Sequence, residues 1–167
     1  MTPTDLVLTP YGVRFGGRLL PCSIGKAGLT TAKREGDGAT PVGTHRIVGL
    51  LFRPDRICRP AEWAEPIGPS DLWSDDCQDI AYNHHVRAPY AHSHEALRRS
   101  DPLYDLILVM DWNWPNAQPG KGSAIFIHQW RRPGYPTEGC IAFCRSDLHW
   151  LASRVQPGTR VIVPNLG

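Results

Sequence analysis

Short apolar runs alternate with clusters of proline, glycine and polar residues along most of the chain. Residues 103–111 (LYDLILVMD) form an apolar run of strand length, which predicts a strand buried on both faces. Residues 45–52, 123–130 and 160–163 predict further strands, and residues 5–20 predict two short strands around a turn. The pattern therefore indicates a fold built mainly from short strands.

Helical periodicity is rare by comparison. In residues 146–155 the apolar side chains recur on one face, and Ser146 can cap the first turn, so this segment predicts a helix. Its apolar face consists of Leu148, Leu151, Ala152 and Val155. Residues 93–99 predict a short helical turn.

Three segments predict loops. Residues 21–28 and 33–41 show no periodicity, and the second is polar and rich in glycine. We expect it to run over the surface, because a buried loop could not satisfy its backbone groups. Residues 53–80 are interrupted by four prolines, but Trp63 and Trp73 supply apolar anchors, so we expect an ordered loop there.

Composition agrees with one small β-rich unit. The chain has 167 residues, which predicts a single domain over residues 1–167. Its 16 glycines and 16 prolines favour turns and short elements over long helices. We therefore predict a mainly β fold, a small sandwich or barrel with one or a few short helices.

Charge and hydropathy exclude two classes of partner. The net charge is only +2 and no long run of like charges occurs, so nothing indicates a nucleic-acid-binding face. No apolar stretch is long enough to predict a membrane span. Residues 1–12 lack the basic and apolar regions of a signal peptide. The chain is then cytosolic, or exported by an unconventional route, or its signal has been removed.

The spacing of the cysteines and histidines bears on metal binding and on one candidate disulfide. Cys140 and Cys144 lie four positions apart but have no matching second half, which argues against structural zinc. A pair between Cys58 and Cys77 would close the proline-rich loop in an oxidising compartment, and five free thiols in the unfolded, unreduced chain would rule it out. A histidine cluster could bind metal, but a polar surface loop is the favoured interpretation, so we expect no metal and no cofactor. The cluster is His84, His85, His92 and His94.

Residues 125–144 hold the most reactive combination of side chains. His128 lies near the end of a predicted strand, and Cys140 directly follows Gly139. An imidazole can take a thiol proton and later return it to a leaving amine. A glycine before the nucleophile lets the backbone turn sharply, so that neighbouring N–H groups can face an oxyanion. Taken alone, the same residues also fit a packed histidine and an inert buried cysteine.

The segment resembles the catalytic motif of the L,D-transpeptidase family, often called the YkuD domain. In that motif a histidine at a strand end is followed by a loop, then by S/T-x-G-C and an apolar residue, which residues 137–141 (TEGCI) match position by position. Residues 38–44 (GATPVGT) resemble the family's T-P-x-G strand entry. Residues 79–83 (DIAYN) and 122–128 (GSAIFIH) resemble one branch of the family. The resemblance spans about residues 30–163.

The resemblance implies a role for each residue of the motif. Cys140 would be the nucleophile that forms a thioester with a donor stem peptide, and His128 the general base and acid. The family's third member acts through a backbone carbonyl, which falls on Gln129 and would hold the imidazole tautomer. The oxyanion hole would come from the backbone N–H groups of Gly139 and Cys140, with Thr137 shaping the turn.

Substrate contacts are expected around this centre. Arg131 and Arg132 can clamp a carboxylate such as those of diaminopimelate, although an exposed basic loop explains each arginine equally well. Tyr82 and Asn83 lie in a matching motif. The candidate substrate-binding residues are Thr137, Tyr82, Asn83, Trp130, Arg131 and Arg132.

Two positions depart from the common family pattern. Glu138 stands where many members have histidine, and Ala142 where many have arginine or asparagine. Both bear on donor and acceptor preference and not on the nucleophile. The resemblance thus implies a periplasmic transpeptidase of peptidoglycan stem peptides, open to inactivation by carbapenems. A non-catalytic peptidoglycan-binding module, an L,D-carboxypeptidase and a cytosolic thiol hydrolase with the same Cys–His pair are the alternatives.

Overall fold

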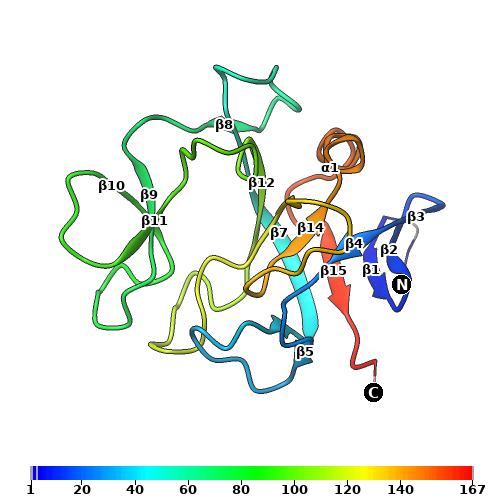
Figure 1. Cartoon of the computed structure of the whole chain (residues 1–167), viewed down its shortest axis with the longest axis horizontal. Coiled ribbons are helices and arrows are strands. Elements are labelled where there is room, and N and C mark those ends of the chain that lie inside the picture. The colour runs from blue at the N-terminus through cyan, green and yellow to red at the C-terminus, as the bar shows by residue number, and fades with distance from the viewer. Residues whose placement is uncertain (1, 3, 167) are drawn as a thin grey trace.

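The computed structural model describes residue 2 and residues 4–166. Strands make up 35% of it and helix 5%, which confirms the mainly β prediction (Figure 1). Ten strands form the main sheet. They are β1 (Leu6–Thr9), β2 (Gly12–Phe15), β3 (Arg18–Leu20), β4 (Cys22–Ser23), β7 (Gly43–Phe52), β8 (Glu65–Pro66), β12 (Leu106–Met110), β13 (Phe126–Gln129), β14 (Ile141–Phe143) and β15 (Arg160–Val163).

The main sheet curves into a nearly closed barrel. Its strand order is β3-β2-β1-β15-β7-β12-β13-β14-β4, with β8 paired to β7. The first and last strands of this order, β3 and β4, are separated in sequence by Pro21 alone, so the chain itself draws the two edges together. Most neighbours are antiparallel, but β1 pairs with β15, β7 with β8, and β13 with β14 in parallel.

Two smaller sheets flank the barrel. β9 (Asp71–Ser74) pairs on its two sides with β10 (His85–Arg87) and β11 (His94–Ala96). Figure 1 shows this three-stranded sheet on the side of the molecule opposite β1–β3. β5 (Leu29–Thr30) pairs with β6 (Thr40–Pro41) near the start of β7.

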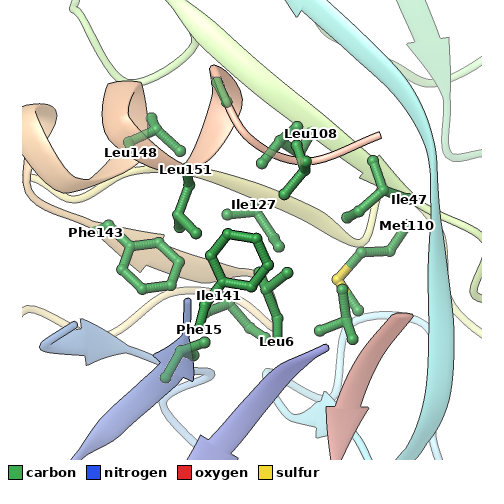
Figure 2. Packing of buried hydrophobic residues seen from close by; sticks show 14 of the residues in the cluster. Leu6, Phe15, Ile47, Leu108, Met110, Ile127, Ile141, Phe143, Leu148 and Leu151 are labelled. Atoms are coloured by element: carbon green, nitrogen blue, oxygen red, sulfur yellow. The ribbon is translucent and has the colours of Figure 1, made fainter. Parts of the chain in front are cut away.

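The prediction of a strand buried on both faces is confirmed at β12. Because side chains alternate along a strand, Leu106, Leu108 and Met110 enter one apolar cluster. Ile107 and Val109 enter a second cluster on the opposite face. The first cluster fills the barrel beneath the helix, and its side chains converge from several strands (Figure 2). The second contains Phe126 and Cys140, so the candidate cysteine lies on this face of the sheet.

The late helix, predicted at residues 146–155, is confirmed, although both its start and its end are corrected. α1 (Arg145–Ala152) is the one helix in the part of the chain that the structure describes. Leu148 and Leu151 point from it into the first cluster (Figure 2). The prediction of Ser146 as its cap is wrong, because the N-cap is Cys144 and no side chain caps the helix. The described residues contain no helix long and apolar enough to cross a bilayer.

Four other sequence expectations need correction. Residues 5–20 hold three strands instead of two, and residues 21–28 include β4. The helical turn predicted at residues 93–99 is wrong, since His94–Ala96 form β11 by pairing with β9. The loop at residues 33–41 does not stay on the surface. Lys33, Ala39 and Thr40 are buried against the turn at residues 137–140, where side-chain hydrogen bonds satisfy the backbone.

Residues 53–80 form an ordered segment, as expected, with β8 and β9 within it. Trp63 packs against the first cluster and Trp73 lies in the second, so both predicted anchors are confirmed. The hypothetical disulfide is not formed, since Cys58 and Cys77 are both free thiols. Apolar packing by these anchors holds the segment without a covalent link.

Candidate active site

The parallel pairing of β13 and β14 places His128 and Cys140 on one face of the sheet. Ile127 lies opposite Ile141, and His128 opposite Ala142. Since side chains alternate, Ile127 and Ile141 turn into the barrel, while His128, which follows Ile127, and Cys140, which precedes Ile141, turn outward. Both outward side chains line one pocket of about 330 Å³.

Cys140 is a buried thiol held at the base of this pocket. Its side chain is in the second apolar cluster, and the residue is 8% exposed. The N–H of Phe126 donates to Sγ at 3.4 Å, and the thiol donates to the carbonyl oxygen of Ala124 at 3.3 Å. Burial raises the pKa of the Cys140 thiol to about 12, so the resting side chain is neutral.

His128 is held as a neutral imidazole with a defined tautomer. Its Nδ1 lies 2.8 Å from the carbonyl oxygen of Gln129. A carbonyl can only accept, so Nδ1 carries the hydrogen and Nε2 keeps its lone pair. Burial lowers the pKa of His128 to about 4, which keeps the ring neutral near pH 7. Tyr104 packs edge-on against the ring at a centroid distance of 5.3 Å and fixes its plane.

The turn that carries Cys140 is closed by the hydroxyl of Thr137. This hydroxyl accepts from the N–H of Gly139 at 3.1 Å and donates to the carbonyl oxygen of Cys140 at 2.6 Å. Gly139 has φ +141°, and a Cβ there would lie 2.9 Å from the carbonyl oxygen of Ala39. Only glycine fits this position. The N–H of Gly139, expected in the oxyanion hole, is thus already engaged within the turn.

Residues 38–44, which resemble the strand-entry motif, stabilise this turn by hydrogen bonding to it. The hydroxyl of Thr40 donates to the carbonyl oxygen of Gly139 at 2.8 Å and accepts from the N–H of Gly25 at 2.9 Å. Thr40 is fully buried. Thr40 was not predicted to lie near the site, although the T-P-x-G motif that contains it was a signal for it.

Tyr82 and Asn83 lie behind the pocket wall and not on its surface. Both are buried, and neither lines the pocket. The Asn83 carbonyl accepts from Trp73 Nε1 at 3.0 Å and from the N–H of Ala124 at 2.9 Å. Its amide donates to two carbonyl oxygens, those of Trp112 and Asn113. Asn83 therefore supports Ala124, the residue whose carbonyl accepts from Cys140.

Ala124 itself has a left-handed backbone, with φ +52°, which is rare for a residue with a side chain. The hydroxyl of Tyr82 donates to Glu35 and accepts from the N–H of Gly122 at 3.0 Å. Ser123 Oγ donates to the same carboxylate at 2.7 Å. These bonds hold the approach to β13 and so hold Ala124 in its strained conformation.

The loop between His128 and Cys140 forms one wall of the pocket. Trp130, Arg131 and Thr137 line the pocket, whereas Arg132 stacks over Tyr135 at 4.8 Å. The structure therefore separates the two arginines that the sequence treated alike. Further lining groups were not identified from sequence: Lys33, Glu35, Asp75, Glu95, Arg99 and Tyr104. Acidic and basic side chains thus both face the pocket.

The four histidines of the sequence cluster do not converge. One nitrogen of each ring bonds a separate partner: His84 the carbonyl of Tyr82, His85 the carboxylate of Asp71, His92 that of Asp76, and His94 the carbonyl of His92. Among residues 2 and 4–166, no group of three or more histidine, cysteine, aspartate or glutamate side chains is placed to hold a metal ion. The imidazole of His128 and the thiol of Cys140 are instead brought together in the lining of one pocket.

Comparison with known families gives one result. The model of the YkuD family, described as the L,D-transpeptidase catalytic domain, matches residues 11–163. No curated protein and no solved structure matches the chain.

Proposed function

The chain belongs to the YkuD family of L,D-transpeptidase catalytic domains, and from this premise we propose that it is a cysteine transpeptidase of peptidoglycan stem peptides. Cys140 is the nucleophile in this proposal, and His128 is the base and acid. The observation that carries it is the shared pocket, which is lined both by the imidazole whose Nδ1 is bonded to Gln129 and by the buried thiol.

The first half-reaction begins with a neutral pair. As Sγ of Cys140 attacks the carbonyl carbon of the donor peptide, the thiol proton passes to Nε2 of His128, and the carbonyl electron pair moves to oxygen. When this intermediate collapses, the C–N bond breaks and His128 returns the proton to the leaving amine. The products are a thioester on Cys140 and a free amine.

The second half-reaction uses the side-chain amine of a diaminopimelate. Its nitrogen attacks the thioester and loses a proton to His128, and the C–S bond breaks as Cys140 regains a proton. The product is an amide crosslink. Water in place of the amine would give carboxypeptidase activity, and a free D-amino acid would give exchange.

The pocket lining supports a substrate with both charges. Arg99 and Arg131 suit carboxylates, while Glu35, Asp75 and Glu95 suit an ammonium group. Diaminopimelate stems carry both. Since peptidoglycan lies outside the inner membrane, the proposal places the working enzyme in the periplasm.

Purified tetrapeptide muropeptides test the proposed activity. Wild-type protein should yield crosslinked dimers by mass spectrometry, and Cys140→Ala should yield none while unfolding at the wild-type temperature. A carbapenem should add its mass to Cys140 of the wild type. Hydrolysed monomers alone would indicate a carboxypeptidase. Retention of muropeptides on the protein, without any covalent change, would indicate a binding module.

A further inference from the structure

Lys33 is a buried lysine that the reaction scheme above leaves unused. Its side chain is only 3% exposed, yet it lines the pocket that contains His128 and Cys140. A Cβ built on Gly139 would lie 3.5 Å from Lys33 Nζ, so the ammonium sits against the residue that precedes the nucleophile. Its stem packs over Gly122, where an added Cβ would lie 3.1 Å from Lys33 Cε.

Two partners hold the ammonium in this position. Nζ donates to Asp37 Oδ1 and to the carbonyl oxygen of Arg34 at 3.1 Å. An ammonium has three N–H donors. Among the described residues two acceptors engage it, so one N–H is left for a further acceptor. Burying a charge is costly unless it is paired, and the Asp37 ion pair offsets that cost.

The proposed reaction develops negative charge in this pocket. It starts from a neutral thiol and a neutral imidazole and creates a negative oxygen in a buried site, where charge is poorly solvated. The N–H of Gly139, a conventional donor to that oxygen, is bonded to Thr137 at 3.1 Å. The charge of Lys33 also acts on Cys140, since it opposes the rise that burial causes in the thiol pKa.

We propose that the Lys33 ammonium stabilises the oxyanion formed when Cys140 attacks the substrate carbonyl, an inference that rests on the proposed role of Cys140. The carbonyl electron pair moves onto oxygen beside Nζ and returns to re-form the carbonyl as the C–N bond breaks. Lys33 keeps its proton throughout, and His128 carries the proton transfers. Lys33 is thereby a catalytic residue, and its bonds to Arg34 and Asp37 also stabilise the loop that carries it.

Two neutral reagents separate this role from a structural one. p-Nitrophenyl acetate acylates a thiol through a tetrahedral oxyanion, whereas iodoacetamide alkylates it by direct displacement and forms none. The rate constants of both reactions at Cys140 are measured with peptide mapping at one pH. In Lys33→Gln, which keeps hydrogen-bonding capacity without charge, the ratio of acylation to alkylation should fall on the order of 10²-fold. Lys33→Met provides a second uncharged variant should Lys33→Gln fail to fold.

Lys121→Gln is the matched control, because it removes the same charge from an exposed lysine that does not line the pocket. Its ratio should stay close to that of the wild type. Equal loss of both rates in the Lys33 variants, or an equal fall of the ratio in Lys121→Gln, would overturn the oxyanion role in favour of a thiolate, loop or general charge effect. Failure of p-nitrophenyl acetate to acylate Cys140 in the wild type would instead overturn the proposed nucleophile itself.

Discussion

The hydroxyl of Thr40 donates a hydrogen bond of 2.8 Å to the carbonyl oxygen of Gly139, ninety-nine positions later in the chain. This bond ties the loop before β7 to the turn that presents the candidate nucleophile. The loop also carries Lys33 and Glu35, so this one hydrogen bond helps to position several groups around the pocket.

Replacing Thr40 with valine should remove this hydrogen bond. Valine keeps the branched shape but leaves the Gly139 carbonyl and the Gly25 N–H buried without a partner, at a cost of about 1–3 kcal/mol. Urea denaturation measures the loss, and the acylation rate at Cys140 should fall with it. Thr44→Val, at an exposed position of β7, is the control and should change neither quantity.

Asn83 should prove essential for the shape of the site without touching substrate. Asn83→Ala removes the partners of Trp73, Ala124, Trp112 and Asn113 and puts alanine at φ +59°. Each unsatisfied buried group costs about 1–3 kcal/mol, so the expected loss of stability exceeds that of Thr40→Val. Asn116→Ala, on an exposed loop, is the control. Wild-type stability in Asn83→Ala would refute the supporting role.

The two arginines after β13 should differ in their effect on substrate binding. Arg131 lines the pocket, whereas Arg132 does not line it and stacks over Tyr135, which does. Loss of one charge-assisted bond to a stem carboxylate should raise KM on the order of tenfold in Arg131→Gln. Arg132→Gln should raise KM less, because Arg132 reaches the pocket only through Tyr135. A larger effect in Arg132→Gln would contradict the assignment.

The pH dependence follows from the burial of His128. Its pKa falls from an ordinary 6.5 to about 4, so the folded state favours the neutral ring. The resulting stabilisation is fully present above pH 6.5 and is lost as the pH falls toward 4. Acylation of Cys140 should keep its rate down to about pH 5 and then decline. A decline centred near 6.5 would show that the ring is solvated. His128→Gln should lose less stability than the wild type over this range, although His45, whose pKa burial also lowers, still contributes a loss.

Local patterns predicted β12 from its continuous apolar run and α1 from its helical periodicity. They misjudged residues 93–99, because β11 owes its conformation to pairing with β9 and not to its own periodicity. The motif around Cys140 and the strand end at His128 were readable from residue type and spacing. The alternation of apolar side chains about His128 also agrees with its outward orientation.

Other parts of the site depend on contacts between distant segments. The polar sequence around Lys33 predicts an exposed charge. Lys33 is buried because its loop packs on Gly139, a contact between segments far apart in the chain. Tyr82 and Asn83 were expected to contact substrate, but their hydrogen bonds to Glu35 and Ala124 turn them away from the pocket. The spacing of residues along the chain does not show whether they line the pocket or lie behind its wall.

The central claim is that Cys140 forms the thioester, and intact-mass analysis of the acyl-enzyme tests it most directly. Wild-type protein is mixed with a purified tetrapeptide stem, without added acceptor, and quenched with acid within the first turnover. The account predicts a mass gain equal to the donor minus its leaving amino acid, mapped to Cys140, removed by hydroxylamine and missing in Cys140→Ala. An adduct of that mass on another residue, or on the Cys140→Ala protein, would contradict it.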